Sequence, residues 1–235
     1  MPEQTPQIAD FVISRHADLA SERAPWDAIW QELADYFLPQ KAQITSKTNE
    51  PDNSRSETLF DSTGLQAAAT LANGSLAYIT PADSRWFVYE PAAAAANDAA
   101  KQWFQSCSEA AQKALAASNF YSEIHELYFD DATFGTYCIF ARPGRLAPLV
   151  FTKFDVGSFS LAEDDEGNID TCFRDLKLTP EQAALYFGEE NLSDKLRAEL
   201  SKCRETGKGS AQKHDFIHAL YPRPEKDREQ GKADG

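Results

Sequence analysis

Basic residues are scarce in this sequence. Among its 235 residues, 23 are Lys or Arg and 37 are Asp or Glu, so the formal net charge is −14. Neutralising nucleic-acid phosphates requires clustered Lys and Arg, and this balance argues against a protein that wraps nucleic acid with a basic face. Hydrophobic residues make up 42% of the chain and aromatic residues 11%. That content suffices for a packed core and argues against a disordered chain.

Long apolar runs are also missing. No stretch approaches the roughly 18 consecutive apolar residues of a membrane-spanning helix. The opening residues, MPEQTPQIAD, have neither the basic start nor the apolar segment of a signal peptide. We therefore expect a soluble protein without an export signal, of a length that suits one large domain or two small ones.

The cysteines are few and far apart. Zinc sites usually contain a close pair such as C-x2-C, and none occurs among Cys107, Cys138, Cys172 and Cys203. A disulfide framework is not expected in a chain of this length without an export signal. We expect four reduced, independent thiols that serve as packing residues.

Apolar periodicity divides the chain into a mainly helical region, residues 1–135, and a β-rich α+β region, residues 136–222. A charged tail that we expect to be flexible follows at 223–235. The fold class is α+β, with long helices in the N-terminal half followed by a small, mainly antiparallel sheet with short helices. In the first region the pattern predicts helices over 8–20, 21–38, 62–79, 97–118 and 121–133, an exposed loop over 40–55 and a short strand over 86–89.

In the second region the period changes to two. Strands are expected over 137–140, 149–154, 159–161, 169–176 and 216–221, with a hairpin turn at 165–168. Thr179 and Pro180 have the residue types that open a helix, and a second amphipathic helix is predicted over 192–203.

The segment 62–79 has an unusual composition. Leu65, Ala68, Ala72 and other small apolar residues form one face of the predicted helix, and Gly64 and Gly74 permit the close approach of another helix. We therefore expect this helix to be buried between neighbours.

No motif for nucleotide or calcium binding is complete. Gly207-Lys208 is followed by Gly209, so the phosphate-loop pattern fails, and a mobile loop is the simpler interpretation. In the acidic turn 163–168, a calcium loop with Gly167 at its sixth position would begin at Ala162, which cannot bind a cation. A solvated hairpin tip is the simpler interpretation there.

Two groups of titratable residues are candidate sites. His214 and His218 would share a face of a helix, but their segment alternates like a strand and has no obvious third ligand. The densest cluster is Glu123, His125, Glu126, Asp130 and Asp131. It is interpreted as a solvated helix face, with a general acid–base site or a metal-dependent hydrolase as the alternative.

The sequence therefore predicts a non-enzymatic protein, with no catalytic, cofactor-binding or metal residues and no cofactor. Neither a G-x-S-x-G elbow nor a G-x-G-x-x-G loop after a strand is present. The larger aromatic residues could form a stacking platform for nucleic acid. Without interleaved Arg and Lys they are better interpreted as core or subunit-contact residues: Trp26, Trp30, Tyr36, Tyr78, Trp86 and Trp103.

Three segments taken in order resemble the opening of the head-to-tail connecting (portal) proteins of short-tailed bacteriophages. They are WQELADYFLP at 30–39, LFDSTGLQAAATLANGSLAYITP at 59–81 and SRWF at 84–87. The patterns at 121–127, 134–136 and 216–222 are similar as well. The likeness extends from about residue 15 to residue 224, and 59–87 is its specific part.

The resemblance implies a structural subunit of a ring at one capsid vertex, a dodecamer in the full-length form. DNA is packaged and ejected through that ring. Its implied partners are further copies of itself, capsid protein, the packaging terminase, tail adaptor proteins and double-stranded DNA passing without sequence-specific binding; no membrane partner is implied. Its implied location is the virion, with the bacterial host cytoplasm during assembly.

Family members are longer than this chain, and their stem helices and motor-facing clip come from the middle of the sequence. The resemblance therefore implies the first, wing-like part, whether this is a fragment, a truncated gene product or a split subunit. The alternative function is a portal-derived monomeric adaptor or capsid-binding module.

Overall fold

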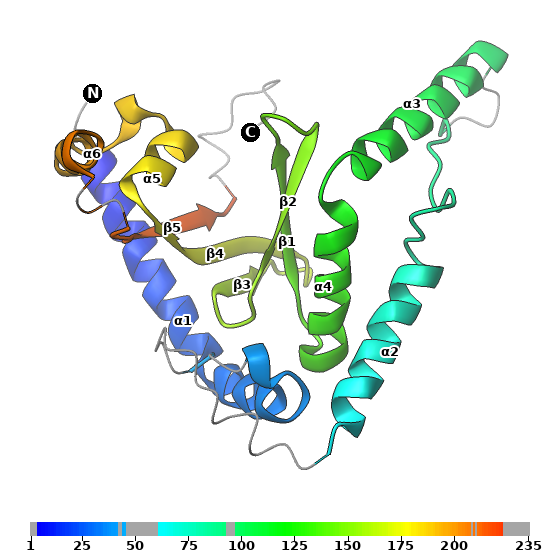
Figure 1. Ribbon diagram of the computed structural model, residues 1–235, viewed down its shortest axis with the longest axis horizontal. Coiled ribbons are helices and arrows are strands. Elements are labelled where there is room, and N and C mark those ends of the chain that lie inside the picture. Colours follow the sequence, from blue (N-terminus) through cyan, green and yellow to red (C-terminus); the bar gives the residue numbers. More distant parts are fainter. Residues whose placement is uncertain are drawn as a thin grey trace. The chain divides into compact units, whose positions relative to one another are not determined.

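The computed structural model describes residues 4–41, 44–45, 61–92, 97–207, 209 and 211–222. Contacts divide the chain into unit 1, Met1–Arg23 with Phe159–Gly235, and unit 2, Ala24–Ser158. The predicted α+β class is confirmed, because long helices precede small antiparallel sheets with short helices (Figure 1). Among the described residues, no helix has both the length and the apolar character needed to cross a membrane.

Three predicted features lie outside this description in whole or in part. Most of the predicted loop over 40–55 is outside the described residues, and so is the whole predicted tail over 223–235. In the Gly207-Lys208-Gly209 loop, Lys208 is also outside them.

The first helix, α1 (Gln4–Phe37), is continuous over 34 residues and contains Pro25. The prediction of two helices with a boundary near residue 21 is therefore wrong. Proline removes an interior hydrogen bond and usually ends or bends a helix. Here packing on both sides of Pro25 outweighs that cost, because Leu19 is 1% exposed within unit 1 and Ala34 is 0% exposed within unit 2.

Unit 1 contains a three-stranded antiparallel sheet. Its order is β3 (Phe159–Glu163), β4 (Ile169–Leu178) and β5 (His214–Leu220). The carboxylate of Asp164 closes the β3–β4 turn by accepting hydrogen bonds from the backbone amides of Glu166 and Asn168, at 2.9 and 2.8 Å. The predicted hairpin and its acidic tip are confirmed.

Two helices, α5 (Pro180–Phe187) and α6 (Asp194–Thr206), complete unit 1, with the 3-10 turn η3 (Glu189–Asn191) between them. The Thr179 hydroxyl accepts from the Gln182 amide at 3.3 Å, and the Gln182 side chain accepts from the Thr179 amide at 3.0 Å. This reciprocal cap confirms the predicted helix start. The helices bury one apolar cluster, which consists of Ala183, Leu192, Leu196 and Leu200.

Side chains of α1 also contact the sheet of unit 1. The Arg23 guanidinium donates a hydrogen bond to the carbonyl of Phe159 at 2.7 Å. On β4, Asp175 lies with Oδ1 3.1 Å from Nε2 of His16. The N-terminal half of α1 is therefore part of unit 1, although the strands that it contacts come much later in the chain.

Unit 2 is built from helices and one hairpin. The elements after α1 are η1 (Pro39–Lys41), α2 (Thr63–Tyr78), α3 (Asp98–Ala116), α4 (Phe120–Phe134), β1 (Cys138–Pro143) and β2 (Leu149–Phe154). Helix α2 lies alongside α4, and α4 packs on the antiparallel β1–β2 hairpin (Figure 1). The buried cluster of this unit consists of Ala34, Leu38, Phe134 and Val156.

The predicted strand at 86–89 is not a strand. Its backbone pairs with no strand among the described residues. The Tyr89 amide instead donates to the hydroxyl of Ser108 on α3 at 2.8 Å, and Trp86 stacks on Phe120 with ring centroids 6.0 Å apart. The aromatic residues of this segment predicted a strand, but the segment lies against helices α3 and α4 instead.

Candidate functional site

The carboxylate cluster of α4 is solvated at Glu126 and Asp131 but not at Asp130. Asp130 is 1% exposed, and its Oδ2 lies 2.5 Å from Nζ of Lys153 on β2. The Lys153 ammonium also lies 2.9 Å from Oδ1 of Asp155. Nζ of Lys41 lies 2.6 Å from Oε2 of Glu126 and 3.3 Å from Oδ1 of Asp130. Two cations thus compensate three carboxylates, and the prediction of a solvated face is wrong for Asp130.

The environment of these groups favours their charged forms. Burial lowers the pKa of Lys153, but hydrogen bonds and attraction from Asp130 and Asp155 outweigh burial, and the net result is a raised pKa. The pKa of Glu126 is lowered, mainly by the hydrogen bond from Lys41. This pattern is that of an ion-pair network which stabilises a fold.

Other polar residues of α4 bind the backbone of β2. The Asn119 side chain accepts from the Phe151 amide at 2.8 Å and donates to the Phe151 carbonyl at 2.7 Å. The Glu123 carboxylate accepts from the Lys153 amide at 2.8 Å. These side chains occupy one edge of the two-stranded sheet, where an unsatisfied backbone group would be costly.

Most of the cluster is therefore engaged in packing contacts. His125 pairs with Asn73 of α2 across 2.9 Å, and Asp131 is exposed. In the part of the chain that the structure describes, no group of three or more His, Cys, Asp or Glu residues could hold a metal ion. The geometry does not favour the hydrolase alternative.

The two histidines singled out by spacing have separate partners. Both lie on β5, with Nε2 of His214 2.7 Å from Oε2 of Glu199, and Nδ1 of His218 accepting from Arg174 at 3.1 Å. Burial, followed by the charge of Arg174, lowers the pKa of His218. Each histidine is thus explained by a contact within unit 1.

The cysteines and the larger aromatic residues divide between packing and surface. None of the four cysteines, all of them described by the structure, forms a disulfide; Cys203 is buried and the other three are half-buried. Among the aromatic residues, Trp86 packs on Phe120, whereas Trp26, Trp103 and Tyr78 are 57%, 63% and 90% exposed. The exposed aromatic residues are available for contacts that the packing of one chain does not use.

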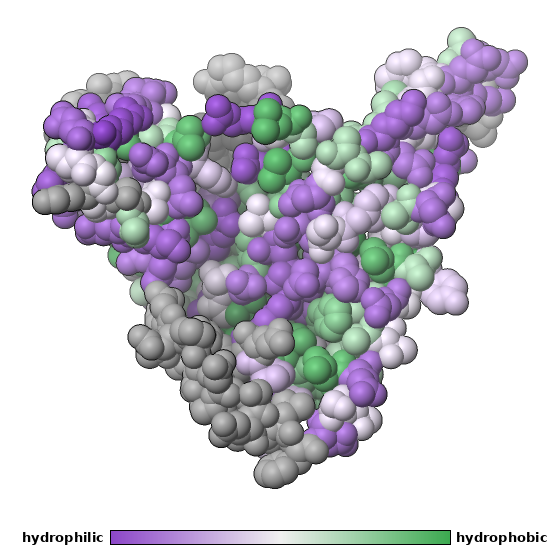
Figure 2. Space-filling view, in the orientation of Figure 1, coloured by the Kyte–Doolittle hydropathy of each residue, from purple (hydrophilic) through white to green (hydrophobic). Residues whose placement is uncertain are grey.

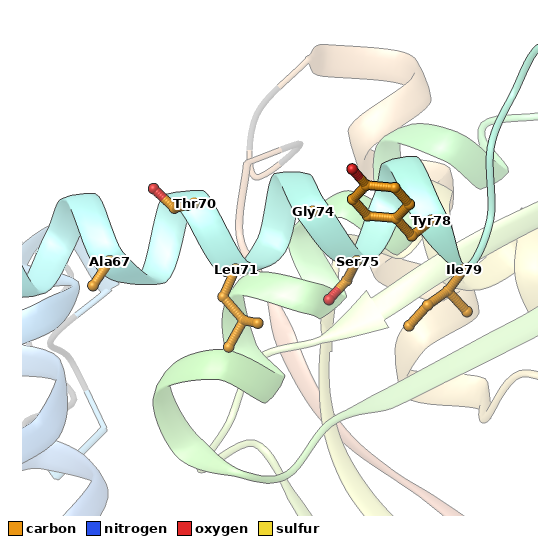
Figure 3. Close-up of a pocket in the computed structure, with 7 residues that line it drawn as sticks. All are labelled: Ala67, Thr70, Leu71, Gly74, Ser75, Tyr78 and Ile79. Carbon is orange, nitrogen blue, oxygen red and sulfur yellow. The ribbon is translucent and has the colours of Figure 1, made fainter.

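The surface of α2 that faces away from α4 is the best-defined feature without a partner in the described chain. We call it the outer face of α2, and it consists of the residues that line one open groove: Ala67, Thr70, Leu71, Gly74, Ser75, Tyr78 and Ile79. Figure 3 shows Thr70 and Tyr78 on one side of the helix, Leu71 and Ser75 on the other, and Gly74 between them.

Exposure distinguishes the two faces of α2. Ala68 and Ala72, on the side of α4, are 6% and 0% exposed. On the outer face Leu71, Tyr78 and Ile79 are 57%, 90% and 58% exposed. The prediction of a helix buried between neighbours is thus met on one side only.

The spacing of apolar residues in α2 indicates its inner face but not its outer face. The helix spans 16 residues without Asp, Glu, Lys or Arg, in a chain whose charged residues make up 26%. An amphipathic surface helix normally carries charged residues on its solvent side. The missing charge was therefore the signal that could have identified the outer face.

Comparison with known proteins gives the family. The family described as "Bacteriophage head to tail connecting protein" matches residues 9–235. The chain belongs to this family, which confirms the resemblance noted in the sequence.

Two curated relatives are similar over most of this chain. A "Probable portal protein" of Bordetella phage BPP-1 is 26% identical over 230 residues, which are 97% of this chain and 40% of the relative. A "Portal protein" of Salmonella phage epsilon15 is 25% identical over 188 residues, 79% of this chain and 34% of the relative. The chain thus spans less than half the length of the relatives it matches.

Proposed function

We propose that this chain is the wing-like N-terminal part of a portal subunit, a structural protein of the ring at one capsid vertex through which phage DNA is packaged and ejected. The family match over residues 9–235 carries the proposal. The geometry supports the proposal in two ways. Asp130, Lys153 and Asn119 hold α4 to the β1–β2 hairpin. Helix α2, which packs on α4, has no charged residue and leaves Leu71 and Tyr78 exposed for contacts with other subunits.

The proposed partners follow from that role. They are further copies of the chain, in a ring that is a dodecamer in the full-length form, together with capsid protein, the packaging terminase and tail adaptor proteins. The proposed location is the virion, and the host cytoplasm during assembly. We propose no enzymatic activity, no cofactor and no membrane partner for the chain.

Charge is compatible with DNA passing without capture. Each copy carries a net charge of −14, and a ring brings many such copies together. Acidic surfaces repel phosphate groups, and tight binding would need clustered Lys and Arg. Double-stranded DNA would therefore slide through such a ring without sequence-specific binding.

Negative-stain imaging of the purified chain tests the proposal. Closed rings of uniform diameter are expected, because subunit contacts in a ring come from surfaces that each copy carries. Particles with no symmetry, together with a chain that binds capsid protein as a monomer, would contradict the ring function and identify an adaptor.

A further inference from the structure

The backbone passes between unit 1 and unit 2 at two points. The first link lies inside α1, between Arg23 and Ala24, and the second lies between Ser158 and Phe159. Because the backbone joins the units at these two links, a change in the orientation of one unit relative to the other must be absorbed there. The local structure of the two links therefore decides whether the backbone can bend between the units.

The first link lacks a helical hydrogen bond. Pro25 has no amide hydrogen to donate to the carbonyl of Ser21, and its ring crowds that carbonyl. Sharp bends in helices occur mainly at such residues. The helix is anchored on either side, because Leu19 is buried in unit 1 and Ala34 is buried in unit 2. The weakest point of α1 therefore coincides with the boundary between the units.

The second link is a turn between β2 and β3. The Ser158 amide donates to the carbonyl of Asp155 at 2.9 Å. Gly157 has a φ of +90°, a backbone conformation that favours glycine. None of the residues 155–158 pairs with a described strand. Sheet hydrogen bonds therefore do not hold the backbone at this link.

The two links lie next to each other. Arg23 is the last residue before the first link, and Phe159 is the first residue after the second. The Arg23 guanidinium donates hydrogen bonds to the Phe159 carbonyl at 2.7 Å and to the Ser160 hydroxyl at 3.0 Å. Two adjacent pivots define one axis, so bending at both links is a rotation about that axis rather than the free motion of a single linker.

We propose that Pro25 and the turn over 155–158 form a hinge, about which unit 1 and unit 2 each move as a rigid body. This hinge goes beyond the proposed ring function and does not depend on it. Hinges are formed by a few residues that absorb the backbone change while the packed parts keep their structure. Such a hinge lets one unit stay fixed in an assembly while the other changes its orientation.

Pulsed electron paramagnetic resonance on the whole chain measures this motion as the width of the distance distribution between two spin labels. The test pair joins Ser201 on α6 in unit 1 to Ser122 on α4 in unit 2. The reference pair joins Ser122 to Glu32 on α1, both within unit 2, and all three positions are exposed. Hydrophilic residues dominate the visible surface over α6 (Figure 2), so a label there displaces no apolar contact.

The labels are attached to an incorporated keto amino acid, which leaves the native cysteines unmodified. Labelled chains are diluted with unlabelled chains, so that neighbouring copies in an assembly do not contribute to the measured distances.

The test pair is expected to give a broader distribution than the reference pair. Pro25→Ala supplies the amide that can donate to Ser21, and is expected to narrow the test distribution to the width of the reference. The same substitution is expected to raise the unfolding midpoint, because alanine is the better helix former. Pro148→Ala, at an exposed position between β1 and β2, is the matched control and should leave both distributions unchanged.

Two outcomes would overturn the hinge. If the test pair is as narrow as the reference pair in the unmodified chain, the units are held rigidly. If the test distribution stays equally broad in Pro25→Ala, the motion arises elsewhere and Pro25 is not its pivot. Neither outcome bears on ring assembly, which imaging of the purified chain tests separately.

Discussion

Lys153 and Asp130 form a buried ion pair that joins the hairpin of unit 2 to α4. Nζ of Lys153 lies 2.5 Å from Oδ2 of Asp130, and the two side chains are 8% and 1% exposed. Charges at such depth must compensate each other, because an isolated buried charge is costly. The pair therefore fixes the position of α4 on β2, and α4 in turn supports α2.

Neutralising one member of this pair is expected to destabilise the chain strongly. Asp130→Asn should lower the free energy of unfolding by about 3 kcal/mol, because Lys153 keeps its charge in a buried position. Urea denaturation measures this change. Asp131→Asn is the matched control at an exposed neighbouring position, with an expected change of about 0.5 kcal/mol or less. Equal effects of the two substitutions would show that the buried pair does not stabilise the fold.

The same pair predicts how stability depends on alkaline pH. The folded pKa of Lys153 is raised above its ordinary value of 10.5. Its contribution to stability is thus fully present below pH 10.5 and is lost as the pH rises through the folded pKa. The difference in unfolding free energy between the unmodified chain and Asp130→Asn should shrink above pH 10.5. A difference that stays constant through that range would contradict the assignment.

Asn119 is expected to hold β2 through its two hydrogen bonds with Phe151. Its side chain does not cap α4, so the effect of Asn119→Ala is not the loss of a helix cap. We expect a loss of about 1–3 kcal/mol, since the Phe151 backbone groups would remain half-buried without these partners. Hydrogen exchange at the Phe151 amide should accelerate. Ser122→Ala, at an exposed position on the same helix, is the control and should leave that amide protected.

A further prediction concerns the start of α5 in unit 1. Thr179→Ala removes the hydroxyl that accepts from the Gln182 amide, and a loss of about 1 kcal/mol is expected. Amide exchange in the first turn of α5 should increase. Thr179→Ser retains the hydroxyl and should behave like the unmodified chain; exchange as fast as in Thr179→Ala would exclude capping as the cause.

Local chemistry made several elements predictable from the sequence. Thr179 and Pro180 indicated the start of α5, and the acidic residues before Gly167 indicated the β3–β4 turn, because both signals depend on neighbouring residues only. The break expected near residue 21 was wrong, because buried contacts of Leu19 and Ala34 maintain the helix through Pro25.

Long-range pairing was not predictable in the same way. Nothing in the α4 sequence shows that Asp130 is buried, because its partner Lys153 lies on a strand that follows a loop and a turn. The outer face of α2 was missed because periodicity identifies an apolar stripe but does not show which side of a helix the chain covers. The side of α2 that is buried is the side on which α4 packs, and the sequence of α2 alone does not show where α4 packs.

Light scattering coupled to size-exclusion chromatography tests the central claim most directly, because it measures the mass of the assembled species. A ring subunit predicts a single species whose mass is a large integer multiple of 26.1 kDa, twelve if the number in the full-length form applies. A mass of 26.1 kDa for the unmodified chain at every concentration would contradict the claim that this part carries the ring contacts.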